Sequence, residues 1–149
     1  GVVPTNLYGT GDKFHPTQGH VISALIYKFV EAVNRDVNVV ELWGTGKPLR
    51  EFMHVDDAAR GILFLTQRYS DAQHINLSGG ETISIKQLAN LIREIVGYQG
   101  KVVFDTTKPD GMMKKSLDNE KISQLGWEAN ISLYDGLSKT IDEFRRGFF

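Results

Sequence analysis

Trp43 and Arg50 stand seven residues apart in the stretch WGTGKPLREFMHVDD, with a glycine-containing turn between them. An indole offers a flat face for stacking, and a guanidinium offers a planar fork that matches two phosphate oxygens at once. Together they could hold a flat, anionic ligand. The same types could instead place Trp43 in a core and pair Arg50 with Glu51 or Asp57, and residue type alone favours that structural interpretation.

His20 and Lys28 form a second candidate pair, two helical turns apart on one side of a predicted helix. Histidine can exchange a proton near neutral pH, and a lysine on the same side could bind the same ligand. A surface histidine beside a solvated lysine is the alternative, which the spacing alone favours. A third candidate pair is Asp110 and Lys115, which lie in and after the turn Lys108-Pro109-Asp110-Gly111. Residue type alone favours an exposed turn with solvated lysines over a binding site.

Composition limits the kind of protein. The chain has 149 residues, of which 41% are hydrophobic and 23% charged, with a net charge of -1, as expected of one ordinary globular domain. We expect no nucleic-acid partner, because the basic residues are scattered, and no membrane segment, because no apolar run is long enough. Four dispersed histidines and no cysteine predict no metal site, and the lack of cysteine is compatible with the cytoplasm, where we expect the protein.

The elements that must position these residues follow from periodicity and turn residues. We predict a strand over residues 50–55 and then a helix over 57–67, with Asp56 or Asp57 as its N-cap. We also predict a helix from His20, strands over 73–78 and 101–105, and a helix that begins with the capping box at Ser84 and stops at Gly97. Residues 39–42 are an apolar run that ends at the turn after Trp43. The Gly79-Gly80 pair should end the strand over 73–78, and two helices over 118–125 and 132–144 complete the chain.

The first residues, Gly1-Val2-Val3-Pro4, have the composition of a buried strand. Because unpaired strand edges are costly or adhesive, such a strand needs a neighbour. We therefore expect that the chain is the C-terminal part of a longer protein whose sheet this strand joins.

Four spaced motifs stand out along the chain: PTNLYG, GHVISALIYK, WGTGKPLREFMHVDD and KPDG. With them the chain resembles the extended short-chain dehydrogenase/reductases that act on sugar nucleotides, and among these the GDP-L-fucose synthase family. The resemblance implies an α/β fold in which residues 1–149 form the C-terminal substrate-binding domain. The dinucleotide-binding domain would lie N-terminal to this chain, and the terminal strand would belong to its Rossmann sheet.

The resemblance also implies roles for individual residues. It implies a GDP-sugar substrate, NADPH bound mainly by the N-terminal domain, and a homodimer when full length. This chain departs from the usual family residues at Thr10, Ser23, Met112 and Met113. The implied cofactor contacts are Pro4, Thr5, Asn6, Leu7 and His20, the catalytic residue is His20, and the implied substrate contacts are Lys28, Trp43, Arg50, Asp110 and Lys115.

The implied reaction converts GDP-4-keto-6-deoxy-D-mannose to GDP-L-fucose by 3,5-epimerisation and 4-reduction. Epimerisation requires acid–base groups, for which His20 is suited, and reduction requires hydride and a proton donor. The Tyr-x-x-x-Lys pair that would donate this proton is absent from the chain, so we expect these residues alone to be inactive. Two alternatives stay open: a sister enzyme acting on another nucleotide-linked sugar, and a non-catalytic nucleotide-sugar-binding module.

Overall fold

The computed structural model describes residues 1–79 and 81–147 and is a mixed α/β structure, as predicted. Its parallel strand pairs are β1 with β5, β2 with β4, β3 with β7 and β4 with β8, whereas β4 and β6 are antiparallel. In chain order the elements are β1 (Val2–Pro4), β2 (Asn6–Tyr8), α1 (Val21–Asn34), β3 (Val39–Trp43), β4 (Leu49–His54), α2 (Val55–Arg68), β5 (Ile75–Leu77), β6 (Glu81–Ser84), α3 (Ile85–Val96), β7 (Lys101–Asp105), β8 (Lys114–Lys115), α4 (Glu120–Gln124) and α5 (Leu133–Arg145).

Strand β4 is the centre of the largest sheet, where it pairs with β2, β6 and β8. Its residues from Glu51 to His54 are all buried, so both faces of the strand are covered. That double burial explains why the sequence alternates only in part, since a strand covered on both faces has no solvent side to fill with polar residues. The predicted strand over 50–55 is confirmed, displaced by one residue at each end.

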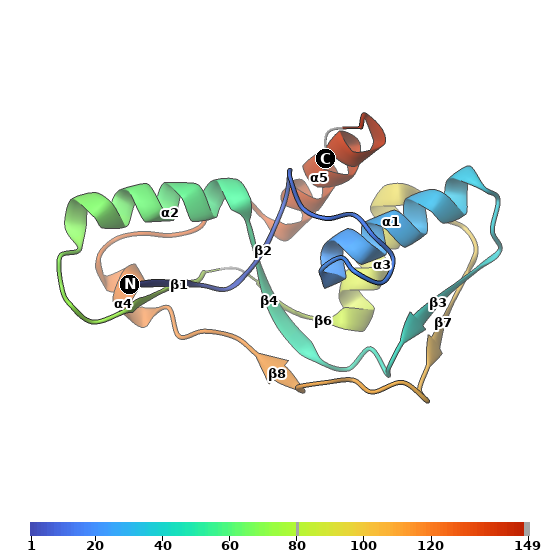
Figure 1. Cartoon of the computed structure of the whole chain (residues 1–149), viewed down its shortest axis with the longest axis horizontal. Coiled ribbons are helices and arrows are strands. Elements are labelled where there is room, and N and C mark those ends of the chain that lie inside the picture. Colours follow the sequence, from blue (N-terminus) through green and yellow to red (C-terminus); the bar gives the residue numbers. More distant parts are fainter. Residues whose placement is uncertain (80, 148–149) are drawn as a thin grey trace.

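Two hydrophobic cores lie on either side of this sheet. Helices α1, α3 and α5 gather at one end of the molecule, and α2, α4, β1 and β5 gather at the other (Figure 1). Phe29, Ile92 and Leu137 represent the larger core, and Met53, Leu77 and Trp127 the smaller one. Strand β4 contributes Phe52 to the first core and Met53 to the second, because successive side chains of a strand point to opposite faces.

The helix predictions succeed where the signal is local. The capping box at Ser84 is present, with Ser84 Oγ accepting the Gln87 amide at 3.2 Å, and Gly97 ends α3 in the left-handed region at φ 80°. The predicted N-cap of α2 is wrong. His54 is the N-cap and its Nδ1 accepts the Asp56 amide at 3.2 Å, so Asp56 and Asp57 lie inside the first turn.

The strand predictions were less complete. Strands β2, β6 and β8 were not predicted, because each is defined by pairing with β4 rather than by its own pattern. The expectation that the first residues form a strand is confirmed by β1, but this strand is not buried within the described chain, where Val2 and Val3 are 40% and 41% exposed. Among the described residues, β1 pairs with β5 alone. The predicted end of the strand over 73–78 includes Gly80, which lies outside the described residues. No helix in the described residues is long and apolar enough to cross a bilayer.

Candidate active site

A cavity of about 280 Å³, here named the His20 cavity, gathers most of the predicted cofactor contacts. Thr5, Asn6, Leu7 and His20 all line it. The fifth predicted residue, Pro4, is exposed in β1 and is not part of this lining. The remaining walls are Val21, Ile22 and Phe52.

Strand β4 fixes the position of the residues that enter this cavity from the first strands. Thr5 Oγ1 and Asn6 Nδ2 both donate to the carbonyl oxygen of Glu51, at 3.3 and 2.8 Å. The Thr5 amide donates to Leu77 O at 3.1 Å, which ties the same residue to β5. The segment is therefore held on two sides by hydrogen bonds before any ligand binds.

His20 lies at the N-cap of α1, yet its ring makes no capping hydrogen bond and its side chain is 85% exposed. Its main chain is held in place, since His20 O accepts the Ala24 amide at 2.8 Å and Ser23 Oγ at 3.0 Å. Its Nδ1 is 3.3 Å from Asp12 Oδ1. The backbone is thus fixed while the imidazole is available to a ligand.

A second cavity, of about 210 Å³ and here named the Lys28–Trp43 cavity, shares the lining residue Val21 with the first. Lys28 and Trp43 come together in it from α1 and β3, elements that are separated in sequence. Lys28 Nζ donates to Glu41 O at 3.1 Å. Burial lowers the pKa of Lys28, an effect that the charge of Glu41 opposes. A lysine that has lost hydration in this way gains more from an anion than an exposed one would.

The turn after Trp43 is closed by Asp110, which joins it to the predicted substrate loop. Asp110 accepts two hydrogen bonds from Thr45, one from the amide and one from Oγ1, both at 2.6 Å. These bonds lower the pKa of the Asp110 carboxyl, the side-chain bond having the larger effect. Gly44 has φ +81°, and a Cβ added there would collide with Asp110 Oδ1, so the position requires glycine.

This closure changes what Asp110 can do for a ligand. Each carboxylate oxygen already accepts a bond from Thr45, so any sugar hydroxyl would have to use the remaining lone pairs. The same loop brings Lys108 Nζ to 5.7 Å from the centre of the Trp43 ring. Sequence reasoning missed both partners, because only the fold brings residue 45 beside 110 and residue 43 beside 108.

Arg50 and Lys115 are neighbours in the register between β4 and β8. They are not among the residues that line the two cavities. Arg50 Nη1 donates to Leu49 O at 2.8 Å, and a Cβ at Gly111 would lie 4.0 Å from Arg50 Nη2. Asp110 is thus bonded to the turn that follows Trp43, and Gly111 of the same loop lies near Arg50, so these predicted residues lie in neighbouring segments but not in one pocket.

The two carboxylates that could have paired with Arg50 have other structural partners. Buried Glu51 accepts the amides of Gly79 and Leu117, each at 3.1 Å, and a bond from Ser78 Oγ. Asp57 accepts a bond from Arg60, and the amides of residues 130 and 131 at 3.0 and 2.9 Å. These bonds tie β4 and α2 to segments far along the chain.

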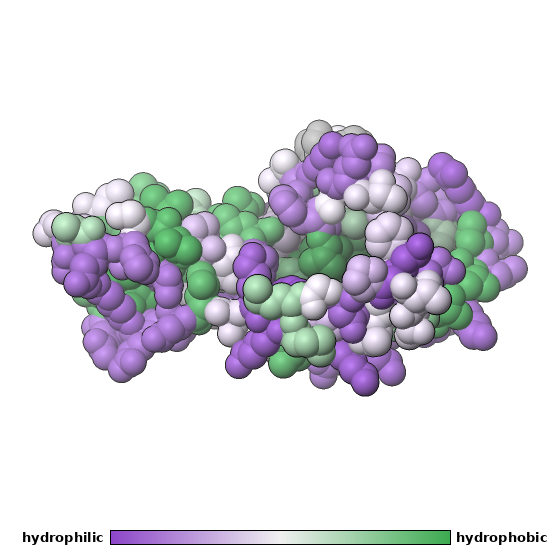
Figure 2. Space-filling view, turned by 60° about the horizontal axis from the view of Figure 1, so that its bottom comes forward, coloured by the Kyte–Doolittle hydropathy of each residue, from purple (hydrophilic) through white to green (hydrophobic). Residues whose placement is uncertain are grey.

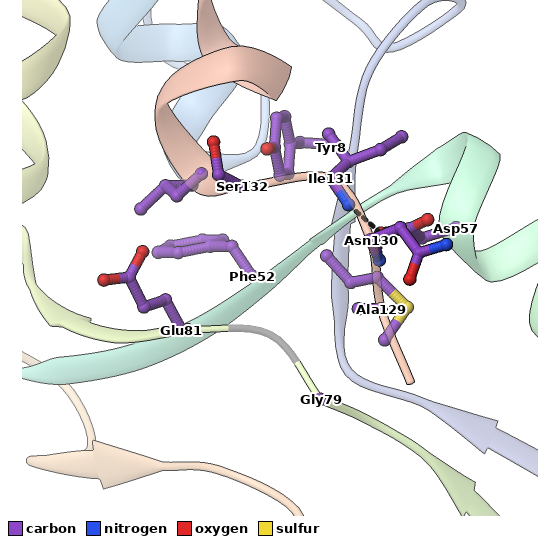
Figure 3. Close-up of a pocket in the computed structure, with 11 residues that line it drawn as sticks. Tyr8, Phe52, Asp57, Gly79, Glu81, Ala129, Asn130, Ile131 and Ser132 are labelled. Carbon is purple, nitrogen blue, oxygen red and sulfur yellow. Dashed lines mark hydrogen bonds between the residues drawn. The ribbon is translucent and has the colours of Figure 1, made fainter. Parts of the chain in front are cut away.

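A third cavity, of about 280 Å³, lies beside Asp57 at the start of α5 (Figure 3). Tyr8 and Ser132 lie together on one side of it, and Phe52 forms part of its wall. Burial raises the pKa of the Tyr8 hydroxyl, with the nearby Asp57 charge adding to the effect. None of the predicted site residues lines this cavity. Within the described residues, no group of three or more His, Asp or Glu is placed to hold a metal ion.

A model of the NAD-dependent epimerase/dehydratase family matches residues 1–78, which contain β1 to β5 and most of the site. The chain belongs to this family. The matched residues include all those that line the His20 cavity, and they also include Arg50 and β5.

Individual relatives agree with the family match. GDP-L-fucose synthase 1 of Arabidopsis thaliana is 49% identical over 140 residues, covering 94% of this chain and 43% of that protein. GDP-L-colitose synthase of Yersinia pseudotuberculosis is 38% identical over 95% of this chain and 46% of its own length. The crystal structure of a GDP-L-fucose synthetase from Naegleria fowleri bound to NADP superposes with a TM-score of 0.92 at 33% identity, over 99% of this chain and 46% of that one. The chain thus spans less than half of each of these proteins.

Proposed function

We propose that residues 1–149 form the C-terminal substrate-binding domain of a nucleotide-sugar epimerase/reductase. The reaction is the conversion of GDP-4-keto-6-deoxy-D-mannose to GDP-L-fucose by 3,5-epimerisation and 4-reduction. In this proposal an N-terminal dinucleotide-binding domain completes the enzyme and binds most of NADPH. The proposed substrate and reaction are supported by the names of relatives whose matches cover nearly the whole of this chain.

One observation supports the proposal: two cavities with different linings share the wall residue Val21. The His20 cavity has a titratable ring and two polar side chains among apolar walls, as sites for small ligands have. The other offers an indole and a partly desolvated ammonium, which suit a base or sugar and a phosphate. Viewed from the β8 side, the surface has a hollow with an apolar floor and a polar rim (Figure 2).

The residues divide the work between binding and proton transfer. Arg50 and Lys115 are adjacent like charges, an arrangement that is unfavourable without an anion and that a diphosphate would neutralise. His20 exchanges a proton at a sugar carbon next to the ketone, and the electron pair of the broken C–H bond moves into the enolate. When bound, NADPH supplies the hydride for the later reduction. Thr5, Asn6 and His20, which line the His20 cavity, would hold one end of this cofactor.

Two further properties belong to this proposal. The enzyme acts in the cytoplasm, which the absence of cysteine permits, and it is a homodimer when full length. A sister reaction, the formation of GDP-L-colitose, is the second candidate, because a GDP-L-colitose synthase is 38% identical over most of the chain. Measuring turnover of the full-length enzyme with both GDP-keto sugars separates the two candidates.

The binding part is tested with Arg50→Ala in the full-length enzyme. We expect the KM for the GDP-sugar to rise by about 10- to 100-fold, the cost of losing charge-assisted bonds to phosphate, while the Kd for NADPH stays unchanged. Arg68→Ala is a matched control, because Arg68 stacks on Phe64 in α2, away from the two cavities. Equal losses for substrate and cofactor, or equal effects of the two variants, would contradict the proposal.

A further inference from the structure

Asp12 is the charged group that faces the His20 ring. Its Oδ1 lies 3.3 Å from His20 Nδ1 and also accepts the Lys13 amide at 2.7 Å. The Asp12 side chain is only 14% exposed, in contrast to the exposed histidine. Its Oδ2 is buried and, among the described residues, has no hydrogen-bond partner. A carboxylate this enclosed in a polar surface loop bears a desolvation cost that a simple solvated loop residue would avoid.

The loop that carries Asp12 is folded tightly back toward His20. The Gly19 amide donates to His15 O at 3.1 Å, and the Asp12 amide donates to Gly9 O at 3.3 Å. A Cβ at Gly19 would lie 2.5 Å from Lys13 O and 2.8 Å from His15 O, so only glycine permits this approach. The loop therefore brings Asp12 to the ring from a position eight residues earlier in the chain.

The contact has a definite chemical consequence. An ionised carboxylate only accepts hydrogen bonds, so His20 Nδ1 must carry the hydrogen in the contact with Asp12 Oδ1. The tautomer is then fixed with N–H at Nδ1, and Nε2 is the nitrogen left to give or take a proton. Because His20 also makes no capping bond, Asp12 is the side chain that orients the ring.

We propose that Asp12 is a positioning residue for His20, holding the ring in the Nδ1–H tautomer so that Nε2 exchanges the proton at the sugar carbon. The inference rests on the proposed function, because it assumes that His20 transfers that proton. The proton that leaves carbon goes to Nε2 and the electron pair goes to the enolate. A proton donor on the opposite face of the sugar, water or an acid of the N-terminal domain, then protonates the carbon, so that its configuration is inverted. Asp12 itself neither gains nor loses a proton in this step.

The test uses Asp12→Asn in the full-length enzyme, with His20→Gln measured beside it. The readout is deuterium incorporation from solvent into GDP-4-keto-6-deoxy-D-mannose without NADPH, which isolates epimerisation from reduction. We expect His20→Gln to slow incorporation by about 100-fold or more. Asp12→Asn should slow it by roughly 10-fold, the lower end of what losing an orienting partner of a functional histidine costs in metal sites, with little change in the KM for the GDP-sugar.

A second readout separates positioning from simple folding defects. Nitrogen-15 NMR of the His20 ring should show the Nδ1–H tautomer in the wild type and a mixture of tautomers in Asp12→Asn. Asp71→Asn is the matched control, because Asp71 also accepts an amide of its own loop, that of Gln73 at 3.0 Å, but lies on a different loop. It should change neither the exchange rate nor the His20 signals. Gly19→Ala, which pushes the loop outward, should reproduce the loss seen in Asp12→Asn.

The possible outcomes distinguish the two proposals. If Asp12→Asn exchanges deuterium at the wild-type rate while His20→Gln is impaired, the role of Asp12 is overturned and that of His20 stands. If Asp12→Asn is slow but its His20 tautomer is that of the wild type, Asp12 is structural and the positioning role is also overturned. If His20→Gln exchanges normally, the catalytic role of His20 fails, and the inference about Asp12 fails with it.

Discussion

His20 and His54 occupy the same local position, at the N-cap of a helix and beside an aspartate, yet their surroundings are opposite. The His20 side chain is 85% exposed and the His54 side chain is fully buried. His20 Nδ1 faces the carboxylate of Asp12, whereas His54 Nδ1 accepts the backbone amide of Asp56. The nearby Asp56 Oδ2 is itself held by Lys139 Nζ at 2.6 Å.

These partners give the two rings opposite tautomers. A carboxylate requires N–H at Nδ1 of His20, and a backbone amide requires a lone pair at Nδ1 of His54. The hydrogen of His54 is therefore on Nε2, which is buried and has no hydrogen-bond partner among the described residues. The His54 ring also packs edge-on against Tyr8, with centroids 5.4 Å apart. One histidine is arranged for exchange with a ligand and the other for packing, so residue type and helix position alone do not define function.

The largest effect expected from this comparison is on stability. His54→Ala in the full-length protein should lower the free energy of unfolding by about 3 kcal/mol, from the cavity left against Tyr8 and the lost helix cap. His20→Ala is the matched substitution and should change it by less than about 0.5 kcal/mol, as at most exposed positions. Chemical denaturation of both variants measures this, and similar losses at the two sites would remove the distinction.

A smaller effect concerns pH. Burial lowers the pKa of His54, although the charge of Asp56 opposes the shift. The unfolded imidazole binds a proton near its ordinary pKa of about 6.5, and the folded one does so only at lower pH. The contribution of His54 to the free energy of unfolding should therefore be complete above about pH 6.5 and decline as the pH falls toward the lowered pKa.

His54→Phe removes this contribution while keeping a ring in the space. As the pH is lowered from about 8 to about 5, the wild type should lose more unfolding free energy than His54→Phe does, because only the wild type has the histidine. Denaturation curves measured at several pH values provide the test. A difference that stays constant over this range would mean that His54 is not buried in its neutral form.

Sequence patterns located the elements that local signals define. The apolar repeat of α1, the capping box of α3 and the strand β7 were all predicted, because each depends on residues within one or two turns. Strand β8 has two residues and exists only through β4, so it has no pattern of its own. The N-cap of α2 was misassigned because Asp is the commoner capping residue, and tertiary burial placed His54 there instead.

The structure shows which predicted site residues lie together, and the contacts among them could not be predicted. The resemblance brought Thr5, Asn6, Leu7 and His20 into one set, and one cavity is lined by all four. The pairing of Asp110 with Thr45 spans 65 residues, and no periodicity relates the two. Asp12 is only eight residues from His20, but the loop between them has no regular pattern, so its fold could not be predicted.

The central claim is that the Lys28–Trp43 cavity binds a guanine nucleotide sugar, and Trp43 can report this directly. Trp43 is 61% exposed, whereas the other tryptophan of the chain, Trp127, is 6% exposed in the smaller core. Titration of the full-length enzyme with GDP should change the tryptophan fluorescence, and Trp43→Phe should abolish that change. A fluorescence change of the same size in Trp43→Phe, with the same GDP affinity, would contradict the claim.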